Sequence, residues 1–570
     1  MQSMTEPQSA PARSTIDSAW WRGAVIYQIY PRSFFDSNGD GVGDLPGIER
    51  HLDHVARLGA DAIWISPFFK SPMKDFGYDV EDYRDVDPIF GTLADFDRLL
   101  ARAHQLGLKV LIDQVLSHTS DRHAWFQESR LSRDNPKSGW YVWADAQPDG
   151  TAPNNWLSVF GGPAWQWDSR RRQYYMHSFL VSQPDLNFHH PEVQQAVLNE
   201  VRFWCERGVD GFRFDACNHQ FHDALLRSNP AVDRSALGHV STVQADNPYA
   251  LQQHLYDKSR PENLAFLERV RAVLDEFGAV SVGEVGDENA PPLMAQYTQR
   301  DRRLHMAYSF SLLTRDGSPA HVRAEVERLE NEMAATGGWG CWALSNHDVV
   351  RVASRWSADG QADPHQARLL LAMLSSLRGS ISLYQGEELG LPEADVPYER
   401  LQDPYGITFW PEFKGRDGCR TPMPWQAQVP QGGFSTIEPW LPVSAEQLPL
   451  AVDAQEADCG ATLHFARAWL AWRKTQPAIV RGDIAFFDAP AAVLLFERRD
   501  AASGAAQLLA FNFSGQPVLS LLPARWAQAV AQAGVPFALG MAGTVEAGAL
   551  HLPAFGAFIG KITDPISSQN

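Results

Sequence analysis

The chain has 570 residues, 44% of them hydrophobic and 21% charged, which excludes a disordered, collagen-like or coiled-coil protein. Its 49 basic and 68 acidic residues give a net charge of −19, which argues against nucleic acid and membrane surfaces as partners. No apolar run reaches the roughly 20 residues that span a bilayer. The N-terminus lacks the apolar core of a secretion signal, and the five cysteines are widely spaced. We therefore expect a cytoplasmic protein whose cysteines are reduced, buried side chains.

From residue 25 onward, short β-rich runs alternate with helical patterns. One apolar stripe at helical spacing, from Ile48 to Leu58, stops at Gly59, and a second stops at Gly107; glycine is typical just after a helix. Eight runs are predicted as strands: residues 25–30, 62–65, 109–113, 211–215, 280–283, 306–310, 340–344 and 380–383. This alternation predicts an α/β fold, a (β/α)8 TIM barrel. The competing doubly wound sheet lacks a glycine-rich phosphate turn after its first strand.

The alternation stops in two places. Between residues 113 and 211 only residues 193–204 have a helical stripe, and the rest is rich in Trp, Tyr, Gly and Pro, which predicts an inserted domain B after strand three. After a last helix at residues 461–472, short alternating runs predict a C-terminal antiparallel β-sandwich. The expected domains are the barrel at 1–113 and 185–477 (domain A), domain B at 114–184 and domain C at 478–570.

Charged side chains follow four of the predicted strands. They are Asp113 and His118 after the third, Arg213 and Asp215 at the fourth, Glu284 after the fifth, and His347 with Asp348 after the seventh. A single Asp at a strand end is usually a helix cap or turn residue. In a barrel, however, the carboxyl ends of all strands meet on one face, where active sites lie. Their joint placement therefore predicts one shared site.

Several carboxylates around one pocket suit glycoside chemistry. One carboxylate attacks the anomeric carbon, and a second donates its proton to the leaving oxygen. These roles need different pKa values. Arg213 and Asp215 share a strand face, so we expect the guanidinium to keep Asp215 ionised. Glu284 has no adjacent cation in the sequence and follows a small, apolar run, as suits a proton donor.

Eight sequence blocks resemble the α-amylase superfamily, glycoside hydrolase family 13, and in particular its α-glucosidase and oligo-1,6-glucosidase branch. In chain order they are AVIYQIYPRSF, GYDV, DQVLSH, QPDLN, GFRFDACNH, GEV, SNHD and GRDGCRTPMPW, within residues 20–425. The resemblance implies that Asp215 is the nucleophile, Glu284 the general acid/base and Asp348 the residue that holds the distorted sugar. It also implies a glucose subsite lined by Asp79, His118, Arg213, His347 and Arg416, with Phe160 or Phe188 stacked on a sugar face.

Ala216, directly after the predicted nucleophile, is expected to face the leaving sugar. In the branch that the chain resembles, Val at this position accompanies α-1,6 preference, and a smaller or polar residue accompanies α-1,4 preference. The resemblance thus implies a retaining, exo-acting α-glucosidase for short α-1,4-linked substrates such as maltose, with transfer to small alcohols or sugars. An α-1,6-glucosidase and a sucrose- or trehalose-type isomerase or transglucosylase remain alternatives. A non-catalytic transporter-subunit relative is disfavoured, because such relatives need a membrane span and tend to lose the acids.

The glycine-rich segment at residues 36–44, DSNGDGVGD, spaces its oxygen atoms as a calcium loop does. The expected ligands are Asp36, Asn38, Asp40, the backbone carbonyl of Val42, and Asp44. The twelfth position is Gly47 and not the bidentate Glu of an EF-hand. On the resemblance we expect a structural Ca²⁺ or Mg²⁺ there, remote from the chemistry, and no organic cofactor. Ser117 replaces the Asn that helps the amylases hold a calcium between domains A and B, which argues against that second site.

Overall fold

The computed structural model describes residues 19–233, 243, 247–522, 526, 530–532 and 541–562. Eight parallel strands form one sheet in the order β11-β10-β9-β5-β2-β1-β13-β12, and a parallel bridge between Ala307 and Gly340 joins its two ends into a barrel. The strands are β1 (Val25–Ile29), β2 (Ala62–Ile65), β5 (Lys109–Val115), β9 (Gly211–Asp215), β10 (Val280–Val285), β11 (Met306–Ser309), β12 (Cys341–Ala343) and β13 (Ser380–Tyr384). The eight predicted strands and the barrel are confirmed.

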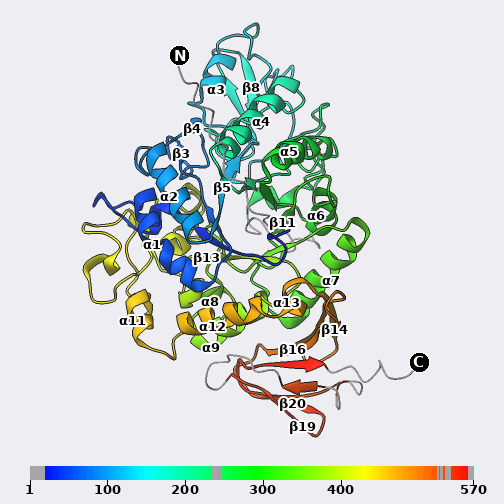
Figure 1. Cartoon of the computed structure of the whole chain (residues 1–570). Coiled ribbons are helices and arrows are strands. Elements are labelled where there is room, and N and C mark those ends of the chain that lie inside the picture. The colour runs from blue at the N-terminus through cyan, green and yellow to red at the C-terminus, as the bar shows by residue number, and fades with distance from the viewer. Residues whose placement is uncertain are drawn as a thin grey trace, which may run out of the picture.

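Helices surround the barrel (Figure 1). They include α1 (Leu45–Leu58), α2 (Leu93–Gln105), α4 (Pro191–Glu206), α5 (Asn263–Phe277), α6 (Ala290–Tyr297), α7 (Pro319–Thr336), α8 (Val352–Arg355), α9 (Pro364–Leu374), α11 (Val452–Ala457), α12 (Thr462–Lys474) and α13 (Pro477–Arg481). α1 shows how the sequence sets their limits. The Asp44 carboxylate caps its first turn, and Gly59, at φ 93°, ends it. Its predicted stripe is fully buried, and each such aliphatic side chain contributes on the order of 1.5–3 kcal/mol.

The predicted insertion lies between β5 and β9, at the top of Figure 1. It holds α3 (Ala124–Ser129) and a three-stranded antiparallel sheet in the order β6-β8-β7, with β6 at Trp143–Ala144, β7 at Trp165–Asp168 and β8 at Gln173–Met176. Trp165 stacks on Trp156 with ring centroids 5.9 Å apart and belongs to the small apolar core of this region. A separate hairpin, β3 (Phe69–Lys70) and β4 (Asp82–Val86), follows β2.

The C-terminal part forms two antiparallel sheets at the bottom of Figure 1. They contain β14 (Asp483–Phe487), β15 (Val493–Arg499), β16 (Ala506–Asn512), β21 (Ala557–Ile562) and β18 (Val530–Gln532) in one, and β17 (Val518–Leu521), β20 (Ala549–Leu552) and β19 (Thr544–Glu546) in the other. Leu495 and Leu508 of the first sheet share an apolar cluster with Leu550 of the second, as in the predicted sandwich. The exact domain limits stay a prediction, and residues 1–18 and 563–570 lie outside the described part.

Two further expectations concern the burial of the cysteines and the length of the helices. Cys205, Cys217, Cys341 and Cys419 are free and buried, but Cys459 is free and exposed. The expectation that all five are buried is therefore wrong for Cys459, which follows the short helix α11 in a turn. Within the described ranges, no helix has the length and apolar character that crossing a membrane requires.

Candidate active site

A cavity of about 140 Å³ opens at the carboxyl ends of the barrel strands. Its wall contains all three predicted catalytic acids, Asp215, Glu284 and Asp348. Four predicted substrate-binding residues also line it: His118, Phe160, Ala216 and Arg416. Side chains that are far apart in the sequence therefore meet where barrel enzymes carry their active sites.

Arg213 lies behind this wall and not in the cavity lining, where the resemblance placed it, but it is the electrostatic centre of the group. Its side chain is 1% exposed and shares the inner face of β9 with Asp215, as the strand period predicts. One guanidinium nitrogen, Nη1, donates to Asp113 Oδ1 at 2.9 Å and to Asp215 Oδ1 at 2.6 Å. The other, Nη2, donates to Glu284 Oε1 and to the Tyr308 hydroxyl. One buried cation thus forms ion pairs with three buried carboxylates.

Arg213 contacts Asp215 as expected, but it shares its charge with two further carboxylates. Burial is the largest influence and raises the pKa of Asp215 well above its usual range. Arg213 opposes the rise, but Glu284 and Asp113 repel the carboxylate and add to it. Burial likewise raises the pKa of Asp113 to about 6. Glu284 has no adjacent cation in the sequence, but tertiary packing brings Arg213 to it from the neighbouring strand β9. Burial and mutual repulsion therefore favour a proton that stays bound to one of the acids around Arg213.

The turn after β9 is joined directly to the end of β10. Ala216 has a φ of 40°, and its backbone N–H donates to Glu284 Oε2 at 2.9 Å. The Cys217 N–H donates to the Glu284 carbonyl at 3.1 Å, and the Tyr308 hydroxyl donates to Glu284 Oε1 at 2.9 Å. The carboxyl group of Glu284 is therefore fixed relative to Asp215 by backbone as well as by Arg213.

Asp348 stands in a different electrostatic setting. Its Oδ1 atom accepts from Arg420 at 2.9 Å and from Arg416 at 3.2 Å, and the Nε2 atom of His347 lies 3.3 Å from Oδ2. Burial works against ionisation, but His347, Arg416 and Arg420 together lower the pKa of Asp348 below its usual range. At neutral pH, where the His347 ring is uncharged, Arg416 and Arg420 keep Asp348 ionised, apart from the group around Arg213.

The two predicted histidines have different positions. His118 lines the cavity, and its Nε2 atom lies 3.1 Å from Nε2 of Gln183. His347 is fully buried behind the wall, with its ring stacked on Tyr78 and its Nε2 atom 2.5 Å from the Tyr78 hydroxyl. Burial lowers the pKa of His118 to about 4 and that of His347 well below its usual range, so both rings are neutral at pH 7.

Two predicted contacts are corrected by the structure. Asp79 is fully buried and does not line the cavity; its carboxylate accepts from Ser71 Oγ at 2.9 Å and from two backbone N–H groups of its own loop. Asp75 occupies the expected place, and its carboxylate accepts from Arg416 Nη2 at 2.9 Å. Phe188 packs in the core against Phe266, because its ring is fully buried, and so it does not face the cavity.

Further residues complete the wall. They are Tyr78, Val159, Phe179, Asn218, His219, Tyr249, Lys258, Gly286, Phe310, Val349 and Tyr405. Tyr78, Asn218 and His219 stand inside the blocks that carry the family resemblance, so the sequence held a signal for them. Phe310 ends the predicted strand 306–310, which also points to this face. The others come from loops whose path only the folded chain determines, and no sequence signal singles them out.

The loop at residues 36–44 closes through its own hydrogen bonds. Asp36 accepts from the backbone N–H groups of Asn38, Gly39 and Gly41 and from Ser435 Oγ at 2.6 Å. Asp44 caps α1 and also accepts from Ser37. In the described ranges of the chain, no group of three or more His, Cys, Asp and Glu side chains is arranged to hold a metal ion. The predicted ligands therefore form no preassembled cluster, and the ion stays a prediction.

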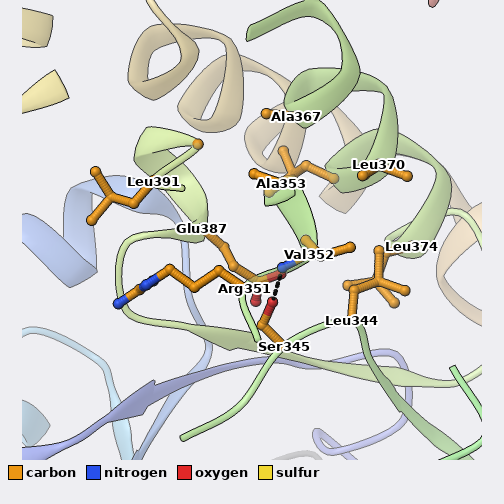
Figure 2. A pocket seen from close by; sticks show the side chains of 12 residues that line it. Leu344, Ser345, Arg351, Val352, Ala353, Ala367, Leu370, Leu374, Glu387 and Leu391 are labelled. Atoms are coloured by element: carbon orange, nitrogen blue, oxygen red, sulfur yellow. Dashed lines mark hydrogen bonds between the residues drawn. The ribbon is translucent and has the colours of Figure 1, made fainter. Parts of the chain in front are cut away.

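A second cavity differs from the first in size and lining. It measures about 20 Å³, room for a single water molecule, and lies between the end of β12 and helices α8 and α9 (Figure 2). Aliphatic side chains line most of it, together with Arg351, Glu387 and Ser345, whose hydroxyl accepts from the Val352 N–H at 2.9 Å. Burial raises the pKa of Glu387 to about 8. None of the predicted site residues reaches this cavity, which we interpret as a packing gap.

Comparison with known proteins agrees with this geometry. The family model for the α-amylase catalytic domain matches residues 28–482. The chain is 55% identical, over 98% of its length and all of the relative's, to the "Probable alpha-glucosidase" of Rhizobium meliloti strain 1021. It is 39% identical to the oligo-1,6-glucosidase of Heyndrickxia coagulans, over 77% of this chain and 82% of that one.

Solved structures give the same result. The crystal structure of the α-glucosyl transfer enzyme XgtA superimposes with a TM-score of 0.92 at 59% identity, covering 95% of this chain and 99% of that one. The trehalulose synthase MutB from Pseudomonas mesoacidophila has a TM-score of 0.84 at 30% identity, covering 95% of this chain and 99% of that one. The barrel, the acids at its strand ends and these matches show that the chain belongs to the α-amylase family, glycoside hydrolase family 13.

Proposed function

We propose that this protein is a retaining α-glucosidase that releases single glucose units from short α-1,4-linked substrates such as maltose and also transfers them to small alcohols or sugars. The observation that carries the proposal is the bridge made by Arg213, which donates to both Asp215 and Glu284 inside a cavity that also contains Asp348. Because one guanidinium contacts both carboxylates, the arrangement favours the short separation of retaining enzymes, about 5–5.5 Å, over that of inverting ones.

In the proposed mechanism, Asp215 attacks the anomeric carbon while Glu284 gives its proton to the leaving glycosidic oxygen, which forms a β-glucosyl ester on Asp215. Glu284, now ionised, then removes a proton from water or from an alcohol. That oxygen attacks the anomeric carbon, and the ester bond to Asp215 breaks. Two inversions give net retention of the α-configuration. The mechanism requires that the proton retained by the three acids around Arg213 resides on Glu284, which leaves Asp215 ionised for attack.

A charged part of the cavity wall supports exo action. Asp75, Asp348 and Arg416 are joined there by hydrogen bonds, and their remaining donors and acceptors suit the hydroxyl groups of a terminal glucose. Transfer is supported by the likeness to the α-glucosyl transfer enzyme XgtA. The likeness to trehalulose synthase structures keeps an isomerase of sucrose as the second candidate. Five free cysteines support a reducing, cytoplasmic environment.

The decisive experiment follows the products of maltose and sucrose by NMR. We expect the first-formed glucose from maltose to be the α-anomer, and added alcohol to yield α-glucosides in competition with water. First-formed β-glucose would contradict the retaining mechanism. An isomeric disaccharide as the main product from sucrose, with little hydrolysis of maltose, would favour the isomerase.

The same assay tests linkage preference in the unaltered enzyme. Because Ala216 leaves room beside the nucleophile, we expect the specificity constant for maltose to exceed that for isomaltose by about 10- to 100-fold, the range that a methyl-scale steric difference supports. A higher value for isomaltose would overturn this assignment. Ala216→Val is a poor test, because the φ of 40° at this position strains a β-branched residue whatever its effect on the substrate.

We also propose that the loop at residues 36–44 binds a structural Ca²⁺ or Mg²⁺ through Asp36, Asn38, Asp40, Val42 and Asp44. An ion that binds only the folded state raises the melting temperature by linkage, so a chelator is expected to lower it and added calcium to restore it. The specificity constant of the still-folded protein is expected to stay unchanged. A melting temperature that is the same with and without chelator would remove the metal from this loop.

A further inference from the structure

A buried carboxylate, Asp403, stands directly behind Arg416. Its side chain is fully buried and lies outside the cavity lining. It accepts three hydrogen bonds from Arg416: Oδ1 from Nη2 at 2.8 Å, and Oδ2 from Nε at 3.1 Å and from the backbone N–H at 2.8 Å. The Asp417 carboxylate in turn accepts from the Asp403 N–H at 2.9 Å. Asp403 therefore holds both the guanidinium and the backbone of Arg416.

The same carboxylate also orders a second part of the cavity wall. Oδ1 of Asp403 accepts from the Tyr405 N–H at 3.2 Å and so caps the short helix α10 (Pro404–Phe409). Tyr405 lines the cavity, and its ring lies 5.3 Å from that of Phe160 on the inserted region. Tyr405 and Arg416 stand at the two ends of one loop, whose base is closed by the contact of Gly406 with Gly415. One side chain thus connects two wall residues.

The charges around Arg416 explain why a third carboxylate is needed. Asp75 and Asp348 line the cavity and contact Arg416 at 2.9 and 3.2 Å. Alone, they would draw the guanidinium toward the space that a sugar must fill. Asp403, which does not line the cavity, attracts the guanidinium away from that space with two charge-assisted bonds, the strong, directional kind. The guanidinium then remains in the wall, where its Cζ atom lies 5.1 Å from the centre of the Phe160 ring.

We propose that Asp403 is a positioning residue for substrate recognition: it holds Arg416 and Tyr405 in the geometry that receives the terminal glucose. The inference rests on the proposed function and goes beyond it, since Asp403 lies outside the cavity lining and acts through other residues. A misplacement of about 1 Å in a recognition group can cost on the order of 100-fold in rate. We therefore expect Asp403 to affect substrate recognition indirectly, by positioning Arg416.

The test is a double-mutant cycle with Asp403→Asn and Arg416→Ala, assayed with an aryl α-glucoside. Asn keeps the shape and the helix-capping oxygen but cannot accept all three bonds from Arg416. We expect Asp403→Asn to lower kcat/KM by about 10- to 100-fold, mainly through KM. In the Arg416→Ala background the same substitution is expected to change kcat/KM by less than about twofold. Asp363→Asn is the matched control, because Asp363 caps α9 before a proline in the same way, outside the cavity lining.

Three results would overturn the inference: near-wild-type kcat/KM for Asp403→Asn, an undiminished effect of that substitution without Arg416, or an equal loss in Asp363→Asn. Asp403→Ser, which retains a capping hydroxyl but cannot reach Arg416, replaces the Asn variant if that one does not fold. Binding of the glucose-shaped iminosugar 1-deoxynojirimycin, measured by calorimetry, is expected to weaken in parallel with KM. A wild-type protein that neither binds it nor cleaves any α-glucoside would contradict the proposed function itself, a different outcome from an unaffected Asp403 variant.

Discussion

Asp215→Asn and Glu284→Gln are each expected to lower kcat by at least about 10³-fold while the protein stays folded, because each removes an interaction made in the transition state. Neither substitution leaves an unpaired buried charge. Each instead removes one of the three carboxylates that share Arg213. The melting temperature is therefore expected to stay at or above that of the wild type. Steady-state kinetics with maltose and thermal unfolding measure both effects.

Azide distinguishes the two roles. With Asp215→Ala, azide enters the space of the lost carboxylate and is expected to restore activity with a β-glucosyl azide as product. With Glu284→Ala and an activated aryl α-glucoside, the ester on Asp215 still forms, so azide is expected to give the α-glucosyl azide. Near-wild-type rates for either variant, or the reverse stereochemistry, would exclude these assignments.

Arg213→Gln is expected to reduce both activity and stability. It leaves Asp113, Asp215 and Glu284 buried without their shared cation, and breaking a buried ion pair from one side costs about 3–5 kcal/mol of the free energy of unfolding. The specificity constant is expected to fall by at least about 10³-fold, since charge that develops in the transition state loses its preorganised partner. Denaturant unfolding and kinetics at pH 7 measure these losses.

The destabilisation has a definite pH dependence. Without the guanidinium, the pKa values of Asp113 and Asp215, already raised by burial, rise further in the folded state. The folded variant then binds protons more tightly than the unfolded chain, so its stability falls relative to the wild type as the pH rises from 4 toward neutral. A pH-independent difference would contradict the conclusion that the acids around Arg213 retain a proton. Arg202→Gln is the control, because its exposed pair with Glu276 contributes only about 0–1 kcal/mol.

Local patterns were enough to predict the barrel and the meeting of the three acids on one of its faces. Strand and helix periods depend on neighbouring residues alone, so the eight strands and the stripe of α1 could be predicted directly. The carboxyl ends of parallel strands must meet on one face of a barrel, and this rule alone brings Asp215, Glu284 and Asp348 together. The shared face of Arg213 and Asp215 follows in the same way from the two-residue period of a strand.

Tertiary structure decided what those residues do to one another. Whether Arg213 serves one acid or three depends on Asp113 and Glu284, which neighbouring strands bring within hydrogen-bond distance. Desolvation, which raises the pKa of Asp215, exists only in the folded protein. Loop hydrogen bonds place Asp75 in the cavity and Asp79 behind it, although both acids stand in one short segment. The sequence alone determined which acidic and basic side chains meet at the barrel face. Long-range packing decided their contacts and protonation, because electrostatic interactions depend on distances that local patterns do not encode.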